Sequence, residues 1–437
     1  MKKVLCLSVF MALLLVGFVY GRGAGEEAKA AEEITLTGMV RDYNLKQDAP
    51  WYTAVKTFAE THPNVKFELE GLPYNDQREK VLITVGAGKG PDVAQVDCIW
   101  LGEFASNKII IDITEKVNAD PDLKNDYLPV FFSSSQWQGK TYGLWLNSDV
   151  RMHAWHKAFF KDAGLDPVVP PKTWAELRAF GKKLNRPDEG VWGYAFPAFS
   201  TDHTADRWYP FLRMGKGGDI LSKDFTKATF NSKAGIDALQ LFVDLMNTDK
   251  VSPTDLLGIK EGDTSNGFIA EKYATHNKCG SYYRSYRDKG LSKEQYKEKI
   301  GMAALPIPAG GKPATGSGGW LLGVTRDSKH PDLALEFLKL VVSPDNVLPF
   351  LTDRAMVPTR KSLMAKEKEF FEAAPYFNIV QEVTPYTHFR PPVPEYMKIS
   401  GEIVTAIQKA LTLEATPKEA LDKAAEKSNQ ILAKRKW

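Results

Sequence analysis

The sequence predicts an α/β protein built from two lobes. Residues 34–40 alternate as a strand does, a helical stripe follows at 51–59, and 65–69 alternate again with one polar face. A helix over about 77–85 then leads to a short apolar strand at 93–96. Strands that alternate with helices indicate a mainly parallel sheet covered on both faces. The chain has 437 residues, which is more than one hydrophobic core usually serves, so we expect two lobes.

Residues 1–30 have the pattern of a secretory signal peptide. Two lysines precede an apolar run at 4–20, and small residues around Ala28-Lys29-Ala30 are typical of a cleavage site. The run is marginal for a membrane span of about 20 apolar residues, and no later run approaches that length. Cys6 lies inside the run, so a lipid-attachment cysteine is not evident. We therefore expect a secreted protein that is periplasmic or extracellular.

Charge and cysteine content argue against a general nucleic-acid binder and against a protein held together by disulfides. Residues 1–30 hold four of the 57 Lys and Arg and two of the 54 Asp and Glu, so the remaining chain is nearly neutral. A general nucleic-acid binder needs a net basic face, which argues against that function. Only Cys98 and Cys279 follow the signal peptide, and two cysteines cannot form a disulfide framework. Whether the two pair is left open by the sequence.

The segment 142–177 is the most informative stretch of the chain. It reads as a strand-like run, a helix at about 154–163, a stop at Gly164 and a second helix. Thr173 and Glu176 have the spacing of a capping box at the start of that second helix. Further amphipathic helices are predicted at 236–246, at 334–341, and from about 402 with a new start at 416–419, whereas the glycine-rich stretch 303–319 reads as a loop or crossover.

Several segments, taken in order, resemble the extracellular solute-binding proteins of bacterial ABC transporters, in the sugar-binding branch that includes the maltose-binding proteins. The matching segments are FAETHPNVK at 58–66, GPDV at 90–93, the block at 142–177, GWLLGV with SKHPDLALEFL over 319–338, and VPTR at 357–360. Each motif is weak alone, but their order and spacing together are specific.

The resemblance implies a two-lobed periplasmic-binding-protein fold, type II-like, in which each lobe is a mixed, mostly parallel sheet flanked by helices. A ligand cleft between the lobes would close by hinge motion. Residues 32–148 and 302–353 would form lobe one, and residues 149–301 and 354–437 lobe two. The function implied is the substrate-binding component of an ABC importer, a monomer that binds a sugar or oligosaccharide and delivers it to a membrane permease, with no cofactor.

A neutral sugar needs flat aromatic walls for its C–H faces and carboxylates, amides or arginines for its hydroxyls. Among ten tryptophans, the candidates lie near strand ends or in connections, where open α/β sheets place ligands, with core packing as the alternative role. These candidates are Trp100, Trp145, Trp208 and Trp320. Trp155 and Trp174 fall on helical stripes and are predicted to be core residues.

The polar candidates come from strand ends and from the resemblance. Asp42 and Asp97 follow the first and third strands, where they either meet the ligand or cap a helix or turn. By the resemblance, other candidates lie at the entry to the second lobe, beside a backbone turn at 280–281, and after the late return to lobe one. These are Asn147, Asp149, Arg151, Tyr282 and Arg354. Asn147, Asp149 and Arg151, at the entry to the second lobe, could instead only tie the hinge. Arg354 could cap a neighbouring helix.

Three other chemistries have weaker support in the sequence. A secreted glycosidase would need two carboxyl groups around the scissile bond, and Asp42 with Asp97 could supply them, although no catalytic signature is present. A charged solute such as a glycerol phosphate could be held by Arg151, Arg207, Arg284 or Arg354. His153 and His156 lie three apart on a predicted helix without a third ligand, so we expect two surface or flanking histidines and no metal site.

Overall fold

The computed structural model describes residues 32–47, 49–279 and 282–435. The predicted signal peptide and the predicted turn at 280–281 lie outside the described residues, as does the side chain of Cys279. Cys98 is a buried free cysteine. Within the described ranges, no helix combines the length and the apolar character needed to cross a bilayer.

The predicted βαβ start of the chain is confirmed. β1 (Ile34–Arg41) pairs in parallel with β2 (Val65–Leu72) and with β3 (Val93–Asp97). α1 (Pro50–Thr61) and α2 (Tyr74–Gly86) make the two crossovers. Buried and more exposed residues alternate along β2, as expected for a strand with one wet face, whereas every residue of β3 is buried. The carboxyl ends of β1 and β3 consequently open on the same edge of the sheet.

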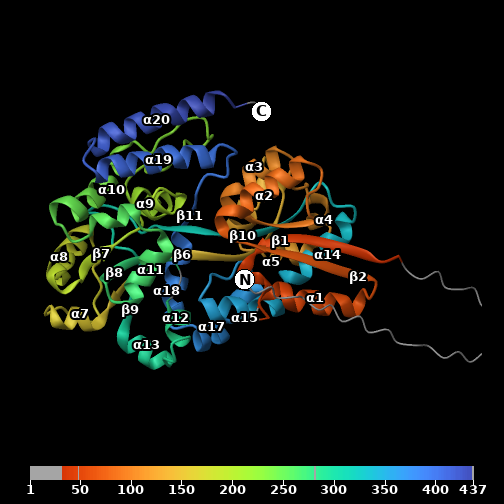
Figure 1. Cartoon of the computed structure of the whole chain (residues 1–437), viewed down its shortest axis with the longest axis horizontal. Helices are drawn as coiled ribbons and strands as arrows, with labels where there is room; N and C mark the ends of the chain where they lie inside the picture. Colours follow the sequence, from red (N-terminus) through yellow and green to blue (C-terminus); the bar gives the residue numbers. More distant parts are fainter. Residues whose placement is uncertain (1–31, 48, 280–281, 436–437) are drawn as a thin grey trace, which may run out of the picture.

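One long strand joins the two lobes. β6 (Leu144–His156) pairs through its first half with β10 (Thr315–Val324), which in turn lies antiparallel to β3. Through its second half β6 pairs with β8 (Tyr273–Cys279) and β9 (Ile300–Ala303), and β7 (Trp192–Ala195) extends that side. Figure 1 shows β1, β2, α1, α2 and α14 on one side of β6 and β10, the first lobe, and α7 to α10, α19 and α20 on the other, the second lobe.

The remaining elements cover the sheet on both sides. In and beside the first lobe lie α3 (Leu101–Ser106), α4 (Thr114–Asn118), α5 (Pro121–Asp126), α6 (Pro129–Ser134), β4 (Gln136–Trp137), β5 (Lys140–Thr141), α14 (Pro331–Val341) and α15 (Pro344–Arg354). From there α16 (Lys361–Met364), α17 (Glu367–Ala373) and α18 (Phe377–Val383) lead to the second lobe, where α18 lines a cavity together with Trp155 of β6 and Met302 of β9. In the second lobe lie α7 (Lys157–Asp162), α8 (Trp174–Leu184), α9 (Asp202–Met214), α10 (Lys233–Val243), α11 (Glu261–Ile269), α12 (Tyr283–Arg287), α13 (Lys293–Lys299), α19 (Tyr396–Leu411) and α20 (Pro417–Ala433). β11 (Thr387–Phe389) adds to β10 between the two groups, next to α19.

Helix caps predicted from the sequence are present. Thr173 and Glu176 form a reciprocal capping box at the start of α8, and Thr416 and Glu419 form another at the start of α20, where Pro417 occupies the first turn. Gly164 has φ of 70°, the left-handed conformation expected of a helix stop.

The predicted helix over 154–163 is wrong in its first part. β6 continues to His156, so Trp155 and both histidines lie on a strand, and α7 begins only at Lys157. Partners β8 and β9 flank this half of β6 and satisfy its backbone groups, which outweighs the helical spacing of the aromatic residues. His153 and His156 are also buried and not at the surface.

The glycine-rich stretch 303–319 is a loop only in part, because β10 begins at Thr315. Gly319 has φ of 137°, and a Cβ atom there would lie 2.2 Å from the carbonyl oxygen of Asn147. Only glycine allows this close approach between β10 and β6. The glycines that favoured a loop in the sequence therefore serve a tightly packed strand pair next to the cleft.

Candidate functional site

A cavity of about 670 Å³ lies between the two lobes. The first lobe contributes the ends of β1 and β3, the start of α2 and the middle of β10. The second lobe contributes the first turns of α9 and α11, together with β6 after its crossing point. The residues that line this cavity include Arg41, Tyr74, Asp97, Asp149, Arg151, Asp202, His203, Asp206, Arg207, Glu261, Tyr282, Trp320 and Arg390.

Five of the residues predicted from the sequence line the cavity. They are Asp97, Asp149, Arg151, Tyr282 and Trp320. Trp100 lines an adjoining cavity of about 330 Å³ and makes edge-on contact with Trp320. The structure therefore brings together six candidates from four separate stretches of the chain.

The other five candidates lie away from the cavity. Asp42 has a 57% exposed side chain that pairs with Arg41, and Arg354 lies over the ring of Phe350. Trp208 and Asn147 are buried. Trp145 packs against Phe131 and Phe389, and its Nε1 donates to the Phe131 carbonyl oxygen at 2.7 Å.

The position of Trp145 has a specific cause. The pairing of β6 with β10 shifts register between Trp145 and Asn147, which is a β-bulge. A bulge interrupts the alternation of side chains along a strand, so Trp145 does not follow the direction of Asp149 and Arg151. The sequence carries no signal for this irregularity, because it depends on the partner strand.

An aromatic wall belongs to the first lobe. The rings of Tyr74, Trp100 and Trp320 lie 5.6 to 5.9 Å apart, and the Arg41 guanidinium lies 5.7 Å from the ring centres of Tyr74 and Trp320. Asp97 accepts a hydrogen bond from the Tyr74 hydroxyl at 3.0 Å and another from the Ile99 N–H. Asp97 thus has both predicted roles, since it lines the cleft and also caps the turn that follows β3. Burial raises the pKa of the Asp97 carboxyl.

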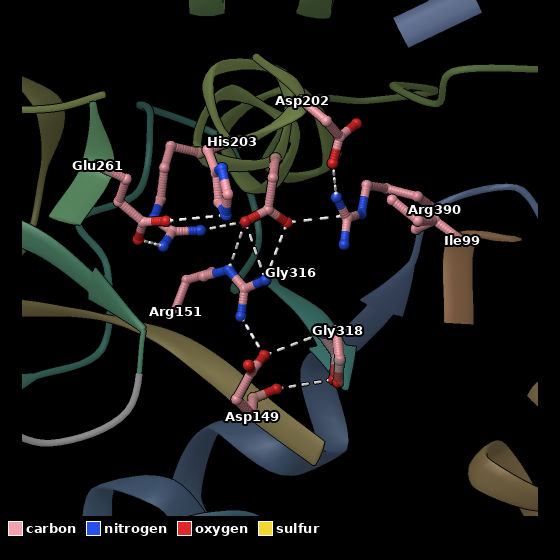
Figure 2. A network of polar contacts seen from close by, with 12 residues as sticks. Ile99, Asp149, Arg151, Asp202, His203, Glu261, Gly316, Gly318 and Arg390 are labelled. Atoms are coloured by element: carbon pink, nitrogen blue, oxygen red, sulfur yellow. Dashed lines mark hydrogen bonds and ion pairs between the residues drawn. The ribbon is translucent and has the colours of Figure 1, made fainter. Parts of the chain in front are cut away.

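A wall of charged side chains in the second lobe, the charged wall, faces the aromatic wall. It consists of Asp202, Asp206, Arg207 and Glu261 on α9 and α11, with Arg151 from β6 and Arg390 from the segment after β11. Arg151 holds Asp206 through two hydrogen bonds of 2.9 and 3.0 Å. Arg151 also pairs with Asp149, and Figure 2 shows these two side chains together.

Asp206 is the centre of the charged wall. It pairs with Arg151 and Arg207, and the Nε of Arg390 lies 3.5 Å from its Oδ1. Burial by itself would raise the pKa of Asp206, but the charges of Arg151, Arg390 and Arg207 hold that pKa far below its usual range. Asp206 is therefore ionised at any physiological pH, and the three guanidiniums are held in place around it.

The ends of the charged wall are also held by hydrogen bonds. Asp202 pairs with Arg390 and accepts from the hydroxyls of Tyr396 at 2.8 Å and Ser400 at 2.6 Å. Glu261 pairs with Arg207. The Nε2 atom of His203 lies 3.1 Å from Oε2 of Glu261 (Figure 2). Such pairing lets buried charges persist and orients their remaining donor and acceptor sites toward the cavity.

Most of the charged wall was missed by the sequence analysis. Asp202 and Asp206 lie four residues apart in a helix that continues with the buried run Trp208 to Leu212. Charged residues one turn apart at the start of a helix that is otherwise largely buried are a usable signal for an internal site. Arg390 has no such signal, since it reaches the cavity from a connection before Pro391 and Pro392.

Metal binding has no support in the part of the chain that the structure describes, where no three His, Cys, Asp or Glu side chains are grouped to hold an ion. His156 instead hydrogen-bonds the Phe268 carbonyl at 2.8 Å, and both ring nitrogens of buried His153 lack a partner among the described residues. Burial lowers the pKa of His153 to about 3 and that of His156 to about 4, so both are neutral near pH 7.

Comparison with known proteins identifies the family. Residues 44–347 match the model of the bacterial extracellular solute-binding protein family, which is more than half of the chain. The protein belongs to this family of extracellular solute-binding proteins. A periplasmic or extracellular location follows from the family.

Solved structures and curated relatives match nearly the whole chain. A solute-binding protein of Thermotoga lettingae bound with α-D-tagatose is 29% identical, with a TM-score of 0.81 over 91% of this chain and 100% of that one. The maltose-bound MalE3 of T. maritima is 25% identical, with a TM-score of 0.78 and coverage of 91% and 100%. The arabinooligosaccharide-binding protein of Bacillus subtilis is 25% identical over 97% of this chain and 99% of its own.

Proposed function

We propose that the protein captures a sugar or short oligosaccharide in the cavity between its lobes and delivers it to the membrane permease of an ABC importer. One observation carries the proposal. An aromatic wall faces a wall of fixed carboxylates and guanidiniums across the cavity, which is what the C–H faces and hydroxyls of a sugar require. The sugars named for the similar proteins support the same ligand class.

Charge balance favours a neutral ligand. Among the described residues lining the cavity there are six Lys and Arg side chains and five Asp and Glu side chains. The guanidiniums deepest in the cavity, those of Arg151, Arg207 and Arg390, each pair with a carboxylate of the protein. A phosphate group would have to compete with those carboxylates, whereas sugar hydroxyls can both donate to carboxylates and accept from guanidiniums.

Ligand binding would favour a closed form because the ligand touches both lobes. Trp320 and Asp97 approach it from the first lobe, and Asp202 and Glu261 from the second. A ligand shifts a conformational equilibrium only by its difference in affinity for the two states, so contacts to both walls are necessary. We propose that 32–148 with 302–353 and 149–301 with 354–437 move as the two lobes, and that the protein acts as a monomer.

A thermal-shift screen of neutral mono- and oligosaccharides tests the proposal. A ligand that binds only the folded state at 100 times its Kd adds about 2.7 kcal/mol to the free energy of unfolding, which raises Tm by several degrees. The matched control is Gly262→Leu. Gly262 lines the cavity, a Cβ there meets nothing within 4 Å, and the added side chain should fill the ligand space without disturbing the fold.

The expected result is a stabilising sugar whose effect Gly262→Leu removes, together with a change in tryptophan fluorescence from Trp320. If no sugar in a broad panel shifts Tm or fluorescence, the assignment to sugars fails. A charged ligand such as glycerol phosphate would instead show affinity that falls steeply with salt. A glycosidase would shorten the oligosaccharides during incubation, whereas a binding protein leaves them intact.

A further inference from the structure

Ion pairs join the two lobes beside the cleft. Asp353, in the last turn of α15, accepts a hydrogen bond from Nη1 of Arg284 at 2.9 Å and another from Arg287. Both arginines belong to α12 in the second lobe, whereas α15 packs against α1 and α14 in the first. Figure 1 shows α12 next to α15. We call the contact of Asp353 with these two arginines the interlobe tie.

Each side of the interlobe tie is anchored in its own lobe. Tyr286 of α12 is buried, and its ring lies 5.4 Å from that of Tyr296 on α13. Phe350 of α15 is also buried and stacks on Tyr43, with ring centres 6.2 Å apart. Because each helix is packed in its own lobe, a separation of the lobes at this point breaks the interlobe tie.

The carboxylate of Asp353 is not stabilised by its own helix. The C-terminal end of a helix carries partial negative charge, so an acidic side chain in the last turn of α15 is unfavourable there. Guanidiniums offset this cost, two from the second lobe and one from Arg354, whose Nη1 lies 3.4 Å from the carboxylate. The Asp353 side chain is only 19% exposed, so these attractions are screened less than at an open surface.

The interlobe tie lies next to the ligand space but outside it. Tyr282 and Ser285, at the start and in the middle of α12, line the cavity of about 670 Å³. Asp353, Arg284 and Arg287 are not among the described residues that line it. Asp353 can therefore act on a ligand only through the position of α12 and of the lobe that carries it.

The two lobes lie close together in this arrangement. The rings of Tyr74 in the first lobe and His203 in the second are 5.5 Å apart, and both line the cavity. We propose that Asp353 is a positioning residue for ligand capture, which holds the lobes in the arrangement that forms the cavity. This inference rests on the proposed function and adds to it a residue that raises affinity without touching the ligand. Ligand and interlobe tie favour the same arrangement, so each strengthens the other.

Four substitutions isolate the interlobe tie. Asp353→Asn removes the charge, and because a neutral side chain suits a helix C-terminus better, the fold of α15 is protected. Arg284→Gln combined with Arg287→Gln removes the same contact from the other lobe. Asp353→Glu restores the carboxylate. The matched control is Asp288→Asn, since Asp288 pairs with the same two arginines at 3.9 and 3.1 Å but belongs to their own lobe.

The first measurement needs no ligand. Small-angle X-ray scattering gives the radius of gyration of the full chain, which increases when the lobes separate. We expect an increase in Asp353→Asn and in the double arginine variant, and no further increase when the two are combined, because both remove one interaction. Asp288→Asn and Asp353→Glu should keep the radius of the unmodified protein.

The second measurement uses D-tagatose, maltose and α-1,5-linked oligomers of L-arabinose as probes. For a sugar that binds, Asp353→Asn should raise Kd about fivefold, mainly through faster dissociation. The Kd of the unmodified protein should also rise between about 0.05 and 0.5 M NaCl, because salt screens the interlobe tie, and Asp353→Asn should lose that rise. A charged ligand would keep its salt dependence in this variant, and so would a protein in which Asp353 only stabilises α15.

The inference is overturned if Asp353→Asn has the same radius of gyration as Asp288→Asn. It is equally overturned if the radius increases while the dissociation rate and salt dependence of a bound sugar stay unchanged, because Asp353 then has no part in capture. If no probe binds the unmodified protein, the proposed sugar-binding function fails, and the radii alone decide whether Asp353 holds the lobes.

Discussion

The two walls of the cleft differ in what holds them. The aromatic wall, Tyr74, Trp100 and Trp320, is packed by ring contacts and has one hydrogen bond, from Tyr74 to Asp97. The charged wall is a continuous set of ion pairs centred on Asp206. A change at Tyr74 or Trp320, which are only partly buried, should therefore alter ligand affinity with modest effect on folding, whereas a change in the charged wall should destabilise the protein as well.

The largest expected effect comes from Asp206→Ala. The substitution leaves Arg151, Arg207 and Arg390 buried around an empty position, and breaking such a buried pair costs about 3 to 5 kcal/mol. Urea unfolding measures the loss, and sugar binding should disappear with it. The matched control is Asp237→Ala, which removes the exposed i,i+4 pair with Lys233 and should cost less than about 0.5 kcal/mol. Equal costs at the two sites would contradict the distinct role given to the charged wall.

Acidification should lower the free energy of unfolding through two buried histidines of the second lobe. His153 and His156 lie buried on β6, with pKa values lowered by burial to about 3 and about 4. In the unfolded chain histidine binds a proton below about pH 6.5, so the unfolded state binds more protons than the folded state between that pH and about 4. Stability is thus unaffected above pH 6.5 and falls as the pH drops below it, by up to about 1.4 kcal/mol per histidine and pH unit.

Unfolding curves between pH 7 and 4.5 check this slope. His153→Phe removes one titrating group while keeping a ring beside Trp155 and Tyr194, so its stability should decline less steeply. A variant with the same pH slope as the unmodified protein would show that His153 does not contribute.

Trp320→Ala tests the aromatic wall. Trp320 is only partly buried and its ring faces the cavity, so we expect the loss of about 1.4 kcal/mol or more of binding free energy, a tenfold or greater rise in Kd. Trp320→Phe retains an aromatic face and should recover part of the affinity. Calorimetry with the recognised sugar separates the two variants, and a Trp320→Ala protein that binds normally would remove this wall from the site.

The smallest effect is expected at Asp42. Asp42→Ala removes an exposed carboxylate outside the cavity and should leave both stability and sugar affinity within error, whereas Asp97→Ala should lower affinity and free the Tyr74 hydroxyl. Both residues were predicted from their position at a strand end. Comparing the sugar affinities of the two variants therefore shows whether that position is enough to predict contact with the ligand. A loss of affinity in Asp42→Ala would place the ligand outside the cavity described above.

Local signals in the sequence were accurate where neighbouring residues decide the structure. The βαβ start, the capping boxes at Thr173 and Thr416 and the helix stop at Gly164 follow from alternation, side-chain hydrogen bonds within one turn, and backbone freedom. The helix predicted over 154–163 was wrong in its first three residues, because β8 and β9 supply strand partners there from more than 100 residues away. Among the site candidates, Trp145 is turned aside by a bulge that depends on β10.

The sequence alone determined the fold class, the family resemblance and the strand end at which Asp97 meets the cleft. These features follow from residue order, because parallel strands bring their carboxyl ends to one edge. Only the tertiary structure showed the charged wall, the neutralisation of its arginines and the interlobe tie between Asp353 and α12. Those depend on side chains far apart in the chain, such as Arg151, Asp206 and Arg390, whose mutual positions are set by the crossing of β6 between the lobes and the packing of α9 against β10.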